Sequence, residues 1–122
     1  MEQSCVIWHI SLTQENIEHL ELVQKNAFRI ILGNQYDSYE ESLKYLNFET
    51  LSTRREQLAL KFAQNCAQNS KTKKIFKLRK TIHKQTLRKQ QKFKTIKANT
   101  KRLAQSAVPY LRKLLNRNLQ KK

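Results

Sequence analysis

Apolar residues recur at helical spacing over residues 12–33 more regularly than anywhere else in the chain. Thr13 offers a side-chain oxygen to first-turn amides, and Gly33 can take the left-handed conformation that ends many helices. The pattern therefore predicts one amphipathic helix between these two residues. Six residues at steps of three and four form its predicted buried face: Ile17, Leu20, Val23, Ala27, Ile30 and Ile31.

A second, shorter helix is predicted directly after a polar turn. Residues 38–41 read Ser-Tyr-Glu-Glu and match a capping box, in which Ser38 and Glu41 satisfy backbone groups at the helix start. The helix should run to Leu46, with Asn47 as its C-terminal cap. Tyr39 and Leu43 are spaced to pack, with Leu46, on the first helix.

A third helix is predicted from Leu51 to about Gln68, capped by Thr50. Its apolar residues form a stripe and an adjacent row of small side chains: Leu51, Leu58, Phe62 and Cys66, then Ala59, Ala63 and Ala67. Because the connections between the three helices are short, the pattern predicts a small three-helix bundle over residues 1–68.

The two ends of the chain carry further apolar clusters. Residues 1–11 are typical of a strand or of the last turns of a helix, with Trp8 as the packing anchor. Residues 106–122 predict a C-terminal amphipathic helix with Pro109 in its first turn. Its apolar stripe lies opposite three cations: Leu111, Leu114, Leu115 and Leu119 face away from Arg112, Lys113 and Arg117. The pattern leaves open whether this stripe folds back on the bundle or docks elsewhere.

Composition agrees with an all-α fold. One Gly and one Pro among 122 residues are far fewer than ordinary chains carry, so tight turns and hairpins are scarce. We predict three segments: the bundle over 1–68, a basic segment over 69–105 and the C-terminal helix over 106–122.

Charge divides the chain sharply. Residues 1–53 contain 8 Asp or Glu and 3 Lys or Arg, whereas residues 54–122 contain 22 Lys or Arg and a single acid, Glu56. The second half therefore repels itself unless an anion is present. Within residues 69–101, an apolar seam at near-helical spacing predicts a basic amphipathic helix, fully ordered only on binding, followed by an extended stretch over 93–99. The seam consists of Ile75, Phe76, Leu78, Ile82 and Leu87.

The basic segment is the main functional signal, because a run of cations without acids is suited to a phosphate backbone. We predict that eleven residues contact nucleic acid: Lys71, Lys73, Lys74, Lys77, Arg79, Lys80, Lys84, Arg88, Lys89, Lys92 and Lys94. Such contacts are salt-sensitive and independent of base sequence. Phe76 and Phe93 have two interpretations, stacking on unpaired bases or packing inside the protein, and phenylalanines at this spacing are more often packed.

Other chemistry has little support. Cys5 and Cys66 lack the spacing of a disulfide framework or a zinc site, and Cys5 with His9 is a weak metal pair. No apolar run approaches the roughly 20 residues of a membrane span, so we expect a nuclear or cytoplasmic protein. We expect no cofactor.

Many positions between Trp8 and Asn116 resemble the region after the polymerase core in reverse transcriptases of non-LTR, LINE-like (jockey-like) retrotransposons. The resembling positions are Trp8, Leu12, Thr13, Leu20, Glu21, Gln24, Lys25, Arg29, Ile30, Ile31, Leu32, Gly33, Tyr36, Ser38, Tyr39, Glu40, Leu43, Leu51, Arg54, Arg55, Leu58, Phe62 and Ala63, then Thr100, Lys101, Arg102, Ser106, Val108, Pro109, Tyr110, Leu111, Leu114, Leu115 and Asn116. The resemblance implies a C-terminal piece lying beyond fingers, palm and thumb. In that family Arg54 and Arg55 open the third helix, and we expect one of them to bond Glu40 or Glu41, with phosphate binding as the alternative.

The chain lacks the palm motif, the endonuclease domain and the Cys-Cys-His-Cys knuckle of those polyproteins, so their chemistry does not transfer to it. Two hypotheses follow. The first is a non-catalytic fragment of a retrotransposon reverse transcriptase that binds RNA or DNA through phosphates near a polymerase core supplied elsewhere. The second is a basic helical interaction protein that binds anionic lipid or an acidic protein.

Overall fold

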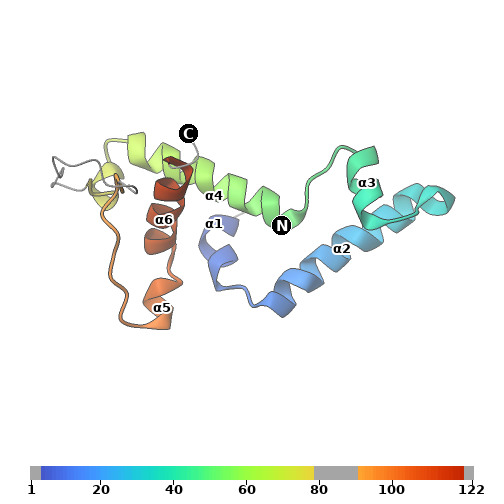
Figure 1. The fold of residues 1–122 in the computed structure, drawn as a ribbon, viewed down its shortest axis with the longest axis horizontal. Helices are drawn as coiled ribbons and strands as arrows, with labels where there is room; N and C mark the ends of the chain where they lie inside the picture. Colours follow the sequence, from blue (N-terminus) through green and yellow to red (C-terminus); the bar gives the residue numbers. More distant parts are fainter. Residues whose placement is uncertain (1–3, 79–90, 120–122) are drawn as a thin grey trace. The chain divides into compact units, whose positions relative to one another are not determined.

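The computed structural model describes residues 4–78 and 91–119 (Figure 1). These residues form an all-α structure, and their one β feature is an isolated antiparallel bridge between Leu78 and Phe93. The α-helices are α1 (Cys5–Trp8), α2 (Gln14–Leu32), α3 (Tyr39–Tyr45), α4 (Leu51–Gln68), α5 (Lys101–Ala104) and α6 (Ala107–Leu119). The 3₁₀ turns are η1 (His9–Ser11), η2 (Gly33–Gln35) and η3 (Lys73–Ile75).

Backbone contacts divide the chain into two compact units. One is Leu12–Gln57, which we call the acidic unit; the other combines Met1–Ser11 with Leu58–Lys122, which we call the basic unit. One boundary falls within α4, whereas we predicted boundaries after residues 68 and 105. The predicted three-helix bundle is not confirmed, because most of α4 belongs to the basic unit.

In the acidic unit, the predicted ends of the helices are confirmed. The Thr13 hydroxyl accepts a hydrogen bond from the Asn16 amide at 3.3 Å, and Gly33 ends α2 with a φ of 51°. The Ser38 hydroxyl accepts a bond from the Glu41 amide at 3.2 Å. Local side-chain chemistry therefore sets where these helices begin and end.

The end of α3 is a Schellman motif. Asn47 has a φ of 53° and donates its amide to the Lys44 carbonyl at 3.2 Å, while the Phe48 amide bonds the Leu43 carbonyl at 2.8 Å. Asn47 is thus the C-terminal cap, as predicted, since asparagine tolerates the left-handed conformation better than most residues.

The face that α2 buries differs from the predicted one. Phe28 is buried and its ring lies 5.9 Å from the rings of both Tyr39 and Phe48, whereas Ile30 is 84% exposed and Ile31 is 67% exposed. Val23 and Ala27 are also exposed, and Ile17 and Leu20 are only partly buried.

The reason is that the neighbours of α2 present polar groups. The Glu21 carboxylate accepts hydrogen bonds from the Ser52 amide at 2.8 Å, the Leu51 amide at 3.3 Å and the Tyr39 hydroxyl at 2.7 Å. The Gln24 side chain donates to the Glu49 carbonyl at 3.2 Å. The face of α2 that carries Glu21, Gln24 and Phe28 supplies hydrogen-bond partners for these amide, hydroxyl and carbonyl groups. A stripe of apolar side chains could not form those hydrogen bonds.

The start of α4 is therefore fixed by Thr50, whose hydroxyl accepts from the Thr53 amide at 3.2 Å, and by Glu21. We expected Arg54 or Arg55 to bond Glu40 or Glu41, and that expectation stays a prediction for Arg54. Arg55 is 5% exposed, and its Nε and Nη2 have no hydrogen-bond partner among the described residues.

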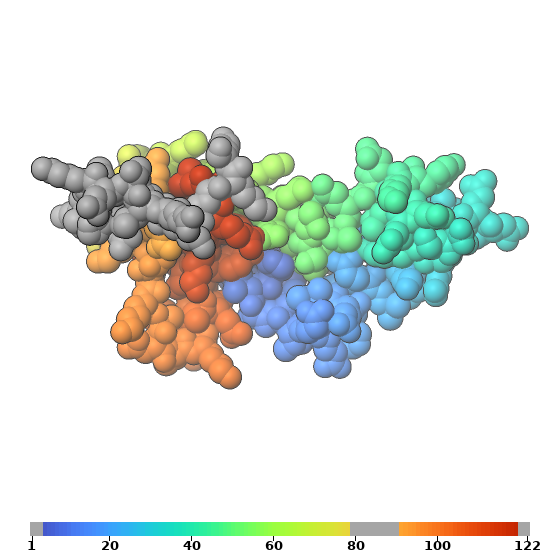
Figure 2. All heavy atoms as spheres, viewed as in Figure 1, coloured from blue at the N-terminus to red at the C-terminus, as the bar shows by residue number. Residues whose placement is uncertain are grey.

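The core of the basic unit joins parts of the chain that are distant in sequence. Seven buried residues from α4, α6 and the segments between them form it: Ala59, Ala63, Phe76, Phe93, Leu111, Leu114 and Leu115. In the space-filling view, the orange residues that precede α6 lie against the red residues of α6 (Figure 2). The N-terminal turns of α1 pack on α6, with Cys5 buried and Val6 against the core. Residues 5–11 form helical turns. Of the two predicted alternatives for residues 1–11, a strand or the last turns of a helix, the helix is therefore the correct one.

Two predicted faces in the basic unit are corrected. The alanine row of α4 enters the core, while Phe62 is 47% exposed, because only small side chains let α6 and the two phenylalanines approach the helix. In α6, three leucines are buried as predicted, but Leu119 is 45% exposed and Arg112 is 7% exposed. The α5 turn, which the pattern did not predict, begins at Thr100, whose hydroxyl accepts from the Leu103 amide at 3.2 Å.

Candidate nucleic-acid interface

Two basic segments, 71–77 and 92–94, are brought together by backbone pairing. Leu78 and Phe93 form an antiparallel bridge, and the Lys94 amide donates to the Lys77 carbonyl at 2.9 Å. In this register Lys77 and Lys94 stand opposite each other. The predicted basic helix is therefore wrong for the described residues 69–78, because the 3₁₀ turn of η3 leads into the bridge; Ile82 and Leu87 lie outside the described residues.

Asn116 holds the second segment. Its side-chain carbonyl accepts from the Phe93 amide at 2.9 Å, and its Nδ2 donates to the Phe93 carbonyl at 3.0 Å. The Asn116 side chain is 4% exposed, so these are buried bonds. A side-chain amide thus supplies the donor and acceptor that a neighbouring strand would otherwise supply.

Arg112 holds both segments at once. Its Nη1 donates to the Lys94 carbonyl at 2.9 Å, and its Nη2 donates to the Ile75 carbonyl. A planar guanidinium can serve two carbonyls in fixed directions, which explains why this cation turns inward in place of facing solvent. Its Nε has no hydrogen-bond partner among the described residues.

Phe76 and Phe93 lie beneath the paired segments. Their ring centroids are 6.5 Å apart in an edge-to-face arrangement, and the side chains are 4% and 9% exposed. Of the two interpretations, packing inside the protein is the one that the structure bears out. Stacking of a base on an exposed ring face is excluded by this burial.

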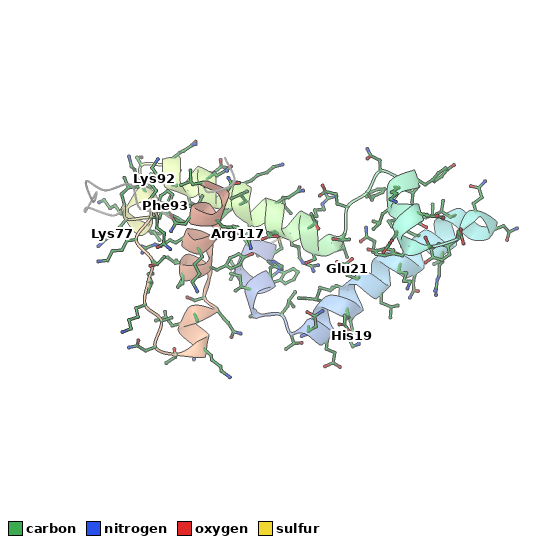
Figure 3. The ribbon with its side chains drawn as sticks, in the orientation of Figure 1. His19, Glu21, Lys77, Lys92, Phe93 and Arg117 are labelled. Atoms are coloured by element: carbon green, nitrogen blue, oxygen red, sulfur yellow. The ribbon has the colours of Figure 1, made fainter. Side chains whose placement is uncertain are left out.

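The lysine side chains of the two paired segments project into solvent. Six of the eleven predicted contact residues are described, and each is exposed: Lys71, Lys73, Lys74, Lys77, Lys92 and Lys94. Figure 3 shows Lys77 and Lys92 on either side of Phe93, beside α6. The other five predicted contacts, Arg79, Lys80, Lys84, Arg88 and Lys89, lie outside the described residues.

Electrostatics at this surface favour an anion. The sequence has no Asp or Glu after Glu56, so no acid of residues 57–122 neutralises these lysines. Like charges opposite each other in an antiparallel pair, as at Lys77 and Lys94, destabilise the pairing. Phosphate groups placed between the lysines would remove that repulsion.

A groove of about 450 Å³ opens next to the lysines. Its walls come from α4, the paired segments and α6. The lining residues are Gln64, Ala67, Gln68, Lys73, Phe76, Leu78, Lys92, Phe93, Leu115, Asn118 and Leu119. We call this the Leu78 groove.

Sequence reasoning missed Asn116, Arg112 and the amides of the Leu78 groove. One signal was present: Phe76-Lys77-Leu78 and Lys92-Phe93-Lys94 alternate apolar and charged residues, which is the period of an extended chain. The partners of that chain on α6 leave no such pattern, because a buried asparagine looks like a surface residue in a helix.

The described residues contain no group of three or more His, Cys, Asp or Glu side chains placed to hold a metal ion. None of the described helices has the length and apolar character that crossing a membrane requires. The sequence matches no protein-family model, and comparisons with curated proteins and with solved structures gave no match.

Proposed function

We propose that the chain binds RNA or DNA through its phosphate backbone, using the lysines around the Leu78–Phe93 bridge. The observation that carries the proposal is the bridge itself, which pairs two lysine-bearing segments from a part of the sequence that contains no Asp or Glu. Arg112 and Asn116 fix both segments to α6, so the lysine surface is ordered before binding. A preordered cationic surface loses less entropy on binding than a flexible tail does.

The proposed role is non-catalytic. We propose that the chain is a C-terminal fragment of a retrotransposon reverse transcriptase. This proposal rests on the family resemblance of the positions from Trp8 to Asn116. It would hold template or primer beside a polymerase core supplied elsewhere. Its single aspartate, Asp37, is exposed, and nucleotidyl transfer by two metal ions needs several converging carboxylates.

Salt-titrated binding tests the phosphate contacts. Fluorescence anisotropy with the full chain and a labelled RNA or DNA should give an affinity that falls linearly with salt on logarithmic axes. Replacing Lys73, Lys77, Lys92 and Lys94 by Gln should lower the magnitude of that slope by roughly 3, because each lost phosphate contact removes about 0.7–0.9.

A matched control keeps the net charge equal. Lys61, Lys97, Lys101 and Lys113 are exposed lysines of the same unit that do not flank the bridge. Their replacement by Gln should leave most of the slope intact. Equal losses in the two quadruple variants would mean that net charge alone drives binding. Binding to anionic vesicles but not to nucleic acid would favour the alternative, a lipid-binding helical protein.

A further inference from the structure

Apolar side chains form part of the lining of the Leu78 groove, unlike the lysine surface beside it. Leu78 is 50% exposed and Leu119 is 45% exposed, and the buried Phe76 and Phe93 also line the groove. We propose that this groove receives an unpaired nucleobase, so that the chain prefers single strands to duplexes. The inference rests on the proposed function, because the lysines that hold the phosphates also bring the base to the groove.

The volume of the groove suits a small organic group such as a nucleobase. Its volume of about 450 Å³ lies in the range of roughly 300–1,000 Å³ that small-molecule sites occupy. In a duplex, each base is stacked on both faces and paired at its edge, so it cannot enter a lateral groove. A base in a single strand can turn out of the chain and enter it.

Three amides make the groove selective for a base over a hydrocarbon. Gln64, Gln68 and Asn118 line it. Each amide carries two N–H donors and a carbonyl acceptor, which are the groups found along the edges of nucleobases. A lipid chain or an apolar helix in the groove would cover these amides and leave them without partners.

Charge at the rim argues for the same occupant. Lys73 and Lys92 belong to the lining, and both are exposed. A nucleotide offers a phosphate to these lysines and a ring to the apolar walls, so one ligand satisfies both parts of the groove. Neither part alone distinguishes nucleic acid from other anions or other apolar ligands.

The groove is already formed in the free chain. Asn116 bonds both backbone groups of Phe93, and Arg112 bonds the carbonyls of Lys94 and Ile75 on the paired segments. The walls therefore need little rearrangement to accept a base, which favours affinity.

Three probes test this inference with the full chain: a 12-nucleotide single strand of thymidine, an abasic strand of the same length and phosphate number, and a 12-base-pair duplex, which carries twice as many strands. Anisotropy at fixed salt should show the single strand binding about tenfold more tightly than the abasic backbone, because the base buries apolar area against the leucines of the groove. Equal affinity for the thymidine strand and its abasic counterpart contradicts the inference. If all three probes still bind in a salt-dependent way, that result supports the proposed phosphate contacts even though the groove binds no base.

Substituting a residue that lines the groove tests whether the base binds there. Leu78→Ser removes an exposed apolar wall without changing charge, and Leu103→Ser makes the same change at a side chain of matched exposure, 43%, outside the groove. Leu78→Ser should erase the preference for the single strand over the abasic backbone but keep the affinity for the duplex. Leu103→Ser should keep both.

Circular dichroism of each variant shows whether it is folded, and Leu119→Ser provides a second wall variant if Leu78→Ser is not. A preference for single strands that survives in both folded wall variants contradicts the groove assignment. If the unmodified chain binds none of the nucleic-acid probes, the proposed function itself is refuted. Vesicles of phosphatidylcholine with phosphatidylglycerol complete the test: binding that falls in Leu78→Ser, without an effect on oligonucleotides, assigns the groove to lipid.

Discussion

The two units of this chain are both helical but are held together in different ways. In the acidic unit, 8 acidic side chains accompany 5 basic ones, and the helix ends are fixed by nearby side chains such as Thr13, Ser38 and Thr50. In the basic unit, 20 basic residues accompany Glu2 alone, and the core joins residues more than 50 positions apart, such as Ala59 and Leu115.

The difference shows where an apolar pattern is reliable and where it is not. The most regular apolar row of the sequence, on α2, is largely exposed, whereas the leucines of α6 are buried. Burial depends on what the facing segment presents. The neighbours of α2 present a tyrosine hydroxyl and open amides, and those of α6 present alanines and phenylalanine rings.

The largest expected effect contrasts these two helices directly. Leu114→Ala should cost about 3 kcal/mol in the free energy of unfolding, because it removes a buried side chain from a packed core. Ile30→Ala, at a residue that is 84% exposed, should change it by less than about 0.5 kcal/mol. Urea unfolding followed by circular dichroism measures both. Similar losses for the two variants would show that the α2 row is covered in solution.

The next effect concerns the asparagine that replaces a strand partner. Asn116→Leu should cost about 2 kcal/mol, since the buried Phe93 amide and carbonyl would lose their partners. Asn99→Leu changes an exposed asparagine of the same unit and serves as the control. Hydrogen exchange of the Phe93 amide should accelerate in the first variant only; unchanged protection would mean that Asn116 does not hold this segment.

A smaller effect is expected at the end of α2. Gly33→Ala should cost about 1 kcal/mol, because an L-residue is strained at a φ of 51°. No atom lies within 4 Å of the added Cβ position, so the cost is one of backbone conformation and not of collision. Asn47→Gly, at the other left-handed cap, should be neutral or slightly stabilising. A Gly33→Ala variant as stable as the parent would contradict the cap assignment.

The smallest effect is a pH dependence in the acidic unit. Burial raises the pKa of Tyr39, and the hydrogen bond to the Glu21 carboxylate and the negative charge of that group raise it further. The folded state therefore keeps Tyr39 protonated when the unfolded chain would ionise it. This contribution to stability is complete below the ordinary tyrosine pKa near 10 and declines as pH rises above it.

Tyr39→Phe isolates this contribution. The difference in stability between the parent and Tyr39→Phe should shrink as pH rises from about 9 to 11. Tyr110, whose pKa is also raised by burial, remains in both proteins and so cancels from the difference. A difference that stays constant over this range would show that the Tyr39 hydroxyl is as accessible in the folded protein as in the unfolded chain.

The sequence by itself determined the local features. The bounds of α2 and α4, the caps at Thr13, Gly33 and Asn47, and the all-α class follow from neighbouring residues, because capping is a contact within a few positions. The charge asymmetry and the exposure of the described lysines followed in the same way, since a run of cations without acids cannot be buried.

Only the tertiary structure decided which faces are buried and what the basic segments pair with. Glu21 could be assigned to the start of α4 only once α2 and α4 were placed, and Asn116 and Arg112 only once α6 met Phe93 and Lys94. The physical reason is that a polar side chain gains from burial only through a specific distant partner. That partner has no signature in the local sequence, whereas periodicity records only that a helix has two unlike faces.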